Sequence, residues 1–339
     1  MRVLITGASG ELGAALARAH MAEGDHVVAL RHVRPLPPEL RGNVEELVGD
    51  IETAGERPWP RTDVVYHCAA LMADQEHQPY RAFHRVNVVG TAHVLSAARK
   101  AGASRIVYVS SVGVLGPTHG AARESQAYGR HLTKYERSKM EAEGVAYTAI
   151  REGIPVTMVR PAQLYGPGLR HLWPRLIRQI QQGRAPILGA GSGQVHLTHV
   201  DDVVRGMRLA ATVSGAVGRT YHLAAAAPVT MRHMIESIAS CLGAPPPPTV
   251  PYGLVDFAAR LMGWAPMWAR PGSLRMLTIH NVQFFVQDRI YSIEQAQTEL
   301  GYQPRCTWDE TIASTVAWYR REAVQPDALG AVRPVRSLG

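Results

Sequence analysis

A short apolar strand pattern runs directly into a glycine-rich turn and then into a helix pattern at the start of the chain. Residues 2–6 read Arg-Val-Leu-Ile-Thr, residues 7–13 contain three glycines, and apolar residues then recur with helical spacing up to Gly24. In this order, glycines permit a tight turn, close approach of the backbone to a pyrophosphate and close packing of helix on strand. The pattern predicts a nucleotide-binding unit; a glycine turn that only packs a helix is the alternative.

Further strand patterns alternate with helix patterns through the first half of the chain, at residues 27–30, 44–48, 63–67, 105–110 and 155–160. This alternation predicts an α/β fold with a doubly wound parallel sheet (a Rossmann fold), in which ligands bind at the carboxyl edge of the strands. The regular pattern ends near Gly166. We expect a dinucleotide-binding domain over 1–165, to which 195–227 returns, a smaller substrate-binding lobe from 166–194 and 228–322, and a flexible tail over 323–339.

Two residues with complementary acid–base chemistry, Tyr135 and Lys139, stand four positions apart. On a helix this spacing puts both side chains on one face. A phenol has an unperturbed pKa of about 10, and a neighbouring ammonium lowers that value because it favours the phenolate. The pair is a candidate for moving a proton on a substrate oxygen, with an ordinary solvated Tyr and Lys pair as the alternative.

Composition limits the remaining possibilities. With 339 residues, 46% hydrophobic and 19% charged, the chain can bury a large core. Its formal charge of +8 is dispersed among 28 acidic residues, which suits an anionic cofactor and does not predict a nucleic-acid partner. Cys68, Cys241 and Cys306 are too few for a disulfide framework or a zinc site. We expect reduced thiols, no bound metal and a cytoplasmic location.

The glycine spacing Thr-Gly-x-x-Gly-x-x-Gly, the Asn87-Val-Val-Gly-Thr segment and the element from Arg160-Pro161 to Tyr165-Gly-Pro together resemble the extended short-chain dehydrogenase/reductase family. The resemblance covers residues 1 to 321. Within the family the chain is most similar to the 3β-hydroxysteroid dehydrogenase and the 3-ketoacyl and dihydroflavonol reductase side. It implies an NAD(P)-dependent enzyme that acts on a CH–OH group, and a homodimer.

The resemblance also implies the cofactor residues. They are, in chain order, Gly7, Gly10, Glu11, Leu12, Arg31, Asp50, Ile51, Ala69, Tyr135, Lys139 and Pro161. Arg31 stands where NAD-selective relatives carry an acidic residue, and its charge suits the 2′-phosphate of NADP. NAD is the alternative, because Arg31 can also be a plain surface arginine and because the Glu11 carboxylate repels a bound anion.

For catalysis, the resemblance implies that Ser111 donates a hydrogen bond to the substrate oxygen, that Tyr135 transfers the proton, and that Lys139 lowers the pKa of Tyr135 and holds the nicotinamide ribose. The neighbouring Ser110 is expected only to satisfy the loop backbone, and Asn87 to hold a water or a backbone group. Met72, Ser111 and Tyr165 are expected to contact the substrate, which is a small molecule.

The predicted reaction interconverts a ketone and a secondary alcohol on an apolar or amphipathic substrate, such as a steroid-like or β-keto-acyl compound. Nucleotide-sugar relatives carry an arginine four residues before the histidine of a His-Val-x-Asp element, and here that position is Val195. A nucleotide-sugar epimerase or dehydratase is the alternative, and a non-catalytic dinucleotide-binding sensor is a second one. The apolar stretch 252–268 is core of the small lobe, a lid over the substrate or a membrane-surface contact.

Overall fold

A computed structural model describes residues 1–56, 58–130, 132–169, 173–263 and 279–323. The tail predicted over 323–339 and the end of the apolar stretch, 264–268, lie almost wholly outside these residues. In the described part, no helix is long and apolar enough to cross a bilayer.

A parallel sheet of seven strands organises the first lobe, in the order β11-β6-β5-β4-β1-β2-β3. Every neighbouring pair runs parallel, as the alternation of strand and helix patterns predicted. The strands are β1 (Arg2–Thr6), β2 (His26–Arg31), β3 (Glu45–Val48), β4 (Val64–His67), β5 (Arg105–Val109), β6 (Val156–Pro161) and β11 (Thr220–Leu223). The order reverses between β1 and β4, so the carboxyl ends of these two strands open a crevice suited to a ligand.

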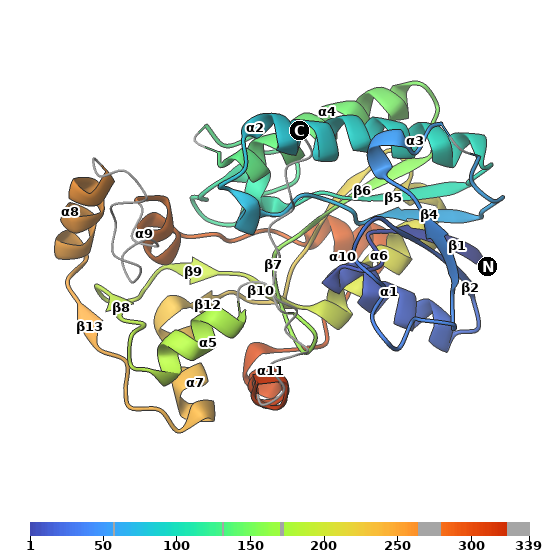
Figure 1. Ribbon diagram of the computed structural model, residues 1–339. Helices are drawn as coiled ribbons and strands as arrows, with labels where there is room; N and C mark the ends of the chain where they lie inside the picture. The colour runs from blue at the N-terminus through green and yellow to red at the C-terminus, as the bar shows by residue number, and fades with distance from the viewer. Residues whose placement is uncertain (57, 131, 170–172, 264–278, 324–339) are drawn as a thin grey trace, which may run out of the picture.

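Helices cover both faces of this sheet (Figure 1). One face packs against α2 (Tyr80–Phe83), a π-helical segment (His84–Val89), α3 (Gly90–Lys100) and α4 (Lys134–Arg151). The other packs against α1 (Glu11–Ala22), α6 (Val200–Thr212) and α10 (Glu294–Leu300). Short 3-10 segments follow β3, β4, β5 and α6 at Ile51–Thr53, Ala73–Gln75, Val112–Leu115 and Ser214–Ala216. The doubly wound parallel sheet predicted from the sequence is confirmed.

The second lobe is built from short elements around a continuous core. It contains α5 (Trp173–Gln181), α7 (Met231–Leu242), α8 (Tyr252–Gly263), α9 (Ile279–Val286), α11 (Trp308–Ala323), and the two-stranded pairs β7 (Gln163–Tyr165) with β10 (Leu197–His199), β9 (Gln194–Val195) with β12 (Val229–Thr230), and β8 (Ile187–Leu188) with β13 (Thr249–Val250). Segment 195–227, which was expected to return to the first lobe, includes α6, which packs against α1, and β11, which pairs with β6.

One helix of the second lobe leaves apolar side chains in solvent. Leu254, Phe257 and Leu261 of α8 are 64%, 67% and 64% exposed, although they have the spacing of one helix face. Of the three alternatives for this stretch, core of the small lobe does not apply to these three residues. Among the described elements, α9 is the one with which α8 makes most of its contacts, and these contacts leave the three side chains exposed.

A buried ion pair ties α4 to β6. The Arg160 guanidinium donates from Nε and Nη2 to the two oxygens of Glu143, at 2.8 and 2.7 Å, and Tyr128 Oη donates to the same carboxylate at 2.7 Å. Arg160 and Glu143 are 2% and 0% exposed. Each charge is buried only because the other compensates it.

Replacing one partner should therefore be costly. We expect Glu143→Gln to lower the free energy of unfolding by about 3–5 kcal/mol, because it leaves the Arg160 guanidinium buried without a counter-charge. Urea denaturation measures the loss. Glu141→Gln on the same helix removes the partner of the exposed Arg137 and should cost less than about 1 kcal/mol. Equal losses of unfolding free energy in the two variants would show that the buried ion pair stabilises the fold no more than the exposed one.

Candidate active site

The glycine turn brings three backbone segments together at the carboxyl edge of β1 and β4. Gly7 has a φ of +72°, and a Cβ on it would stand 2.7 Å from the amide nitrogen of Ala69. A Cβ on Gly13 would stand 2.3 Å from the carbonyl oxygen of Gly7. Only glycine fits at either position. The turn leads into the N-terminus of α1, where the first-turn amides and the helix dipole favour a phosphate group.

The other predicted cofactor residues lie at or just after the carboxyl ends of sheet strands, or at the start of α1. Arg31 ends β2, Asp50 and Ile51 follow β3, and Ala69 follows β4. Asp50 caps the following 3-10 turn by accepting from the amide of Glu52 at 2.9 Å, and Ile51 is buried. Gly10, Glu11 and Leu12 begin α1, and Pro161 ends β6 in a buried position. The backbone cradle fits a dinucleotide; in the described residues, no cluster of side chains could hold a metal ion.

Arg31 is already engaged by a neighbouring carboxylate. Its Nε donates to Glu46 of β3, and its Nη1 donates to the carbonyl oxygen of His32 at 3.0 Å. The sequence did not reveal this contact, because it depends on the parallel register that sets Arg31 beside Val48. An anion at Arg31 has to share the guanidinium with Glu46.

Helix α4 begins with an unusually complete set of caps. Thr133 and Glu136 form a capping box, in which each side chain accepts from the main-chain amide of the other residue. The Glu76 carboxylate accepts from the Tyr135 amide at 2.8 Å. Lys134 donates from Nζ to the carbonyl oxygens of Glu76 and Gln78 at 2.6 and 2.8 Å. The segment after β4 therefore fixes the first turn of α4, which carries Tyr135.

Ser111 is the second residue after β5 and lies beside Tyr135. Its Oγ accepts from the amide of Gly113 at 3.1 Å, which leaves its own hydrogen available for donation. Ser110 was expected to play this backbone role, and the expectation is wrong: Ser110 Oγ is buried and has no hydrogen-bond partner among the residues described. The backbone turn after β5 orients Ser111, not Ser110, toward the Gly113 amide.

The phenol of Tyr135 is held in its protonated form. Burial raises the pKa of Tyr135 to about 12, and a hydrogen bond with Ser111 acts in the opposite direction. Lys139 was expected to lower this pKa through its charge, but its Nζ donates to the carbonyl oxygen of Val109 at 2.6 Å. In this structure, burial dominates the titration of Tyr135.

Asn87 connects the segment after β4 to α4. Its Oδ1 accepts from the amide of Leu71 at 2.7 Å, and its Nδ2 donates to the carbonyl oxygen of Leu71 at 3.0 Å and to Ser138 Oγ at 2.8 Å. The prediction that Asn87 holds a backbone group is confirmed. It lies in the π-helical segment, a distortion that is frequent at functional sites.

The two remaining predicted substrate residues have different positions. Met72 follows β4 and is 41% exposed. Tyr165 is fully buried, where its ring packs against Trp173, Trp308 and His199 and its hydroxyl bonds to Thr311 Oγ1 at 2.7 Å. The prediction that Tyr165 contacts the substrate is wrong for this structure, because the aromatic core of the second lobe takes up both its ring and its hydroxyl.

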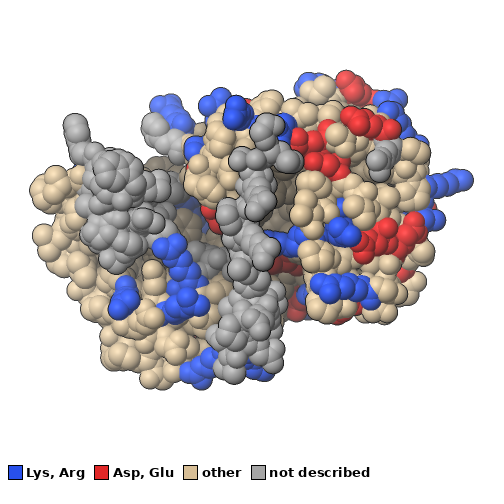
Figure 2. All heavy atoms as spheres, in the orientation of Figure 1, with Lys and Arg blue, Asp and Glu red and all other residues tan. Residues whose placement is uncertain are grey.

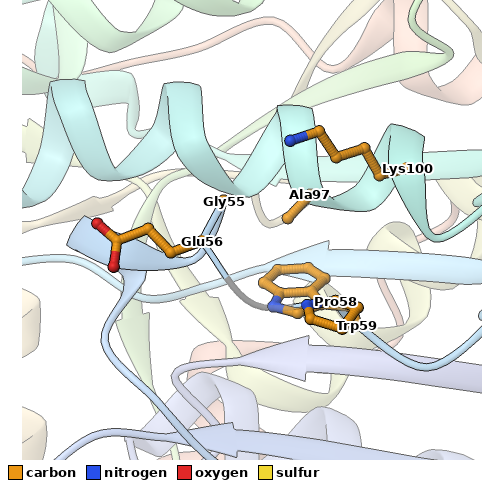
Figure 3. A pocket seen from close by; sticks show the side chains of 6 residues that line it. All are labelled: Gly55, Glu56, Pro58, Trp59, Ala97 and Lys100. Carbon is orange, nitrogen blue, oxygen red and sulfur yellow. The ribbon is translucent and has the colours of Figure 1, made fainter.

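A hollow lies at the other end of α3, away from these residues. It has a volume of about 270 Å³ and is lined by Gly55, Glu56, Pro58, Trp59, Ala97 and Lys100 (Figure 3). Lys100 ends α3, whereas Asn87 precedes its start, so the hollow opens near the amino edge of the sheet. It does not belong to the candidate site.

Known proteins resemble the chain over nearly its whole length. It is 29% identical to 2-alkyl-3-oxoalkanoate reductase of Stenotrophomonas maltophilia, over 91% of this chain and 97% of the relative. It is also 29% identical to 4-hydroxy-2-methyl-3-oxo-4-farnesyl-3,4-dihydroquinoline-1-oxide ketoreductase of Stigmatella aurantiaca, over 91% and 93%. Among solved structures, MoeE5 in complex with UDP-glucose and NAD superposes with a TM-score of 0.76 at 28% identity, over 95% of this chain and all of MoeE5.

Residues 3–224 match the NAD dependent epimerase/dehydratase family. The matched segment contains the glycine turn, Ser111, Tyr135 and Lys139, together with six of the seven sheet strands and all of β1 except Arg2. With ketoreductases and a dinucleotide-bound neighbour among its relatives, the site fits an oxidoreductase that uses a nicotinamide dinucleotide. The chain belongs to the NAD dependent epimerase/dehydratase family, within the extended short-chain dehydrogenases/reductases.

Proposed function

We propose that the protein is a reductase that interconverts a ketone and a secondary alcohol on an apolar or amphipathic substrate, with NADP as its preferred cofactor. One observation carries the proposal: a half-buried, protonated Tyr135 lies beside Ser111 at the carboxyl edge of the sheet, with Lys139 one helical turn away. The two curated relatives named above are both ketone reductases by name.

Ser111, Tyr135 and Lys139 each have a separate role in the proposed reaction. A bound nicotinamide dinucleotide supplies the hydride. Ser111 donates a hydrogen bond to the carbonyl oxygen, which stabilises the charge that develops there. Tyr135 donates the proton that completes the alcohol, which suits a phenol whose pKa of about 12 keeps it protonated at neutral pH. Lys139 places a cation next to this site and holds the nicotinamide ribose.

The exposed face of α8 supports an apolar substrate. Leu254, Phe257 and Leu261 together present a hydrophobic surface on the second lobe, which we propose binds the substrate. Burying such a surface against a ligand stabilises the complex by about 25 cal/mol per Å². Figure 2 shows Lys and Arg side chains on the same lobe, and basic residues suit an amphipathic substrate with an anionic end.

One observation favours the runner-up, a nucleotide-sugar epimerase or dehydratase. Val195 takes the position of the usual arginine, but Arg289 forms a β-bridge with Val195 and brings an arginine to the same place. Arg289 is 6% exposed, lies 5.0 Å from the Phe284 ring, and has no carboxylate within ion-pair distance in the described parts of the chain. A buried guanidinium without a counter-charge is costly and suits an anionic ligand.

Tyr135→Phe tests the proposed chemistry. We expect kcat to fall by about 10²–10⁴-fold, because the variant removes the general acid and almost no volume. The Kd for NADPH should stay within a few-fold of wild type. Tyr147→Phe, which removes a second hydroxyl from α4 at its bond to Thr220, should leave kcat unchanged. A kcat of Tyr135→Phe close to wild type would refute the role of this residue.

Arg31→Met tests the cofactor preference. A charge-assisted contact to the 2′-phosphate contributes about 1.5–3 kcal/mol, so NADPH should bind roughly tenfold to a hundredfold more weakly to the variant while NADH binding stays unchanged. Glu46→Gln should have the opposite effect on NADPH, because it removes the carboxylate that competes for Arg31. Fluorescence titration of both cofactors measures the four constants. Equal losses for NADPH and NADH would leave the preference without support.

A substrate panel separates the two functions. We expect NADPH oxidation with steroid, β-keto-acyl or flavonoid ketones and no conversion of UDP- or TDP-sugars. Arg289→Met should leave kcat/KM for a neutral apolar ketone within a few-fold of wild type, since such a substrate presents no anion to this guanidinium. If nucleotide sugars are epimerised without added cofactor, and Arg289→Met abolishes that reaction, the runner-up is the correct function.

A further inference from the structure

The ammonium of Lys139 is a buried cation with few partners. Lys139 is 2% exposed, and among the described residues its Nζ donates one hydrogen bond, to the carbonyl oxygen of Val109 at 2.6 Å, although an ammonium has three donors. No described carboxylate lies within ion-pair distance of Nζ; Glu143, one turn further along α4, is bound to Arg160. Burial lowers the pKa of Lys139 to about 8.

An aromatic ring lies under this cation. Nζ of Lys139 stands 4.5 Å from the centroid of the Tyr108 ring, within the range in which the negative face of an aromatic ring attracts an ammonium. Tyr108 belongs to β5 and directly precedes Val109, so two consecutive residues contact the same ammonium. Its ring is fully buried and stacks at 5.6 Å on His67, its register partner in β4.

We propose that Tyr108 is a positioning residue for Lys139: its ring face and the main-chain oxygen of Val109 form a seat that holds the buried ammonium in place and charged. The sheet builds this seat. The pairing of β4 with β5 sets the Tyr108 ring on His67, and His67 is itself held by Thr6 at 2.8 Å and Thr91 at 3.0 Å. The catalytic importance of the seat rests on the proposed function, whereas its effect on the ammonium does not.

The other titratable groups around Lys139 keep one charge state near neutral pH. Burial lowers the pKa of His67 on β4 to about 3, and raises the pKa of Cys68 and of Tyr135 to about 12. Burial also raises the pKa of Tyr108 itself well above its usual value. Glu143 stays paired with Arg160. A change in the titration midpoint of Lys139 between pH 6 and 9 therefore reflects a change in its contacts with the Tyr108 ring and the Val109 oxygen.

The small number of lysines in the chain makes the pKa of Lys139 simple to measure by NMR. It contains only three lysines, Lys100, Lys134 and Lys139, so ¹³Cε-lysine labelling yields three NMR signals, and Lys139→Arg identifies the one from Lys139. We expect Tyr108→Leu to lower the titration midpoint of Lys139 by about one pKa unit, because the ring no longer stabilises the charged form. Tyr108→Phe keeps the ring and should leave the midpoint in place. Tyr108→Met is a second ring-free variant if Tyr108→Leu fails to fold.

Tyr66→Leu is the matched control. Tyr66 precedes His67 in β4, is equally buried and lies on the opposite face of the sheet, so its loss should destabilise the fold without moving the titration midpoint of Lys139.

Activity gives a second measurement. With a ketone that the enzyme reduces, the alkaline limb of the kcat/KM profile should move together with the Lys139 midpoint in Tyr108→Leu and should stay in place in Tyr108→Phe and Tyr66→Leu. An unchanged or raised midpoint in the ring-free variants overturns the proposal. A lowered midpoint in a protein that reduces no ketone upholds the seat and refutes only the proposed function.

Discussion

The close contact among β1, α1 and β4 at the glycine turn is the constraint on which the site depends. Gly7 lets the turn approach the backbone of Ala69, and Gly13 lets α1 approach the carbonyl oxygen of Gly7, at distances that leave no room for a Cβ atom. This packing sets the carboxyl ends of β1 and β4 side by side, at the point where the strand order reverses. The N-terminus of α1 then faces the same crevice as the residues that follow β4 and β5.

Helix α4 is the second fixed element, and it is held at its first turn and in its middle. Its first turn is capped by Thr133 and bound to Glu76, and its middle is joined to β6 through Glu143 and Arg160. Between these anchors the helix buries Lys139 on the Tyr108 ring. A buried ammonium lowers the stability of a fold, and proteins retain such a group where function requires it.

Much of this arrangement could be predicted from the sequence. The strand and helix patterns, the glycine turn and the Tyr135 and Lys139 spacing all arise from residues close together in the chain, and the seven-stranded sheet confirms the strand and helix patterns. The burial of Tyr165 and the exposure of α8 were harder to predict, because a buried aromatic core and an exposed apolar helix have similarly apolar sequences. We also expected a lowered pKa for Tyr135, whereas burial raises it. Burial depends on tertiary packing, which local sequence spacing does not show.

The sequence by itself determined the class of fold, the nucleotide-binding turn and the helix face that carries the acid–base pair, because local spacing and the special backbone freedom of glycine suffice for these. Only the tertiary structure decided which groups meet across strands: Arg31 with Glu46, Val195 with Arg289, and Lys139 with the ring of Tyr108. These contacts follow from strand register and from the packing of α4 on the sheet. Both depend on residues far apart in the chain, whose meeting no local pattern encodes.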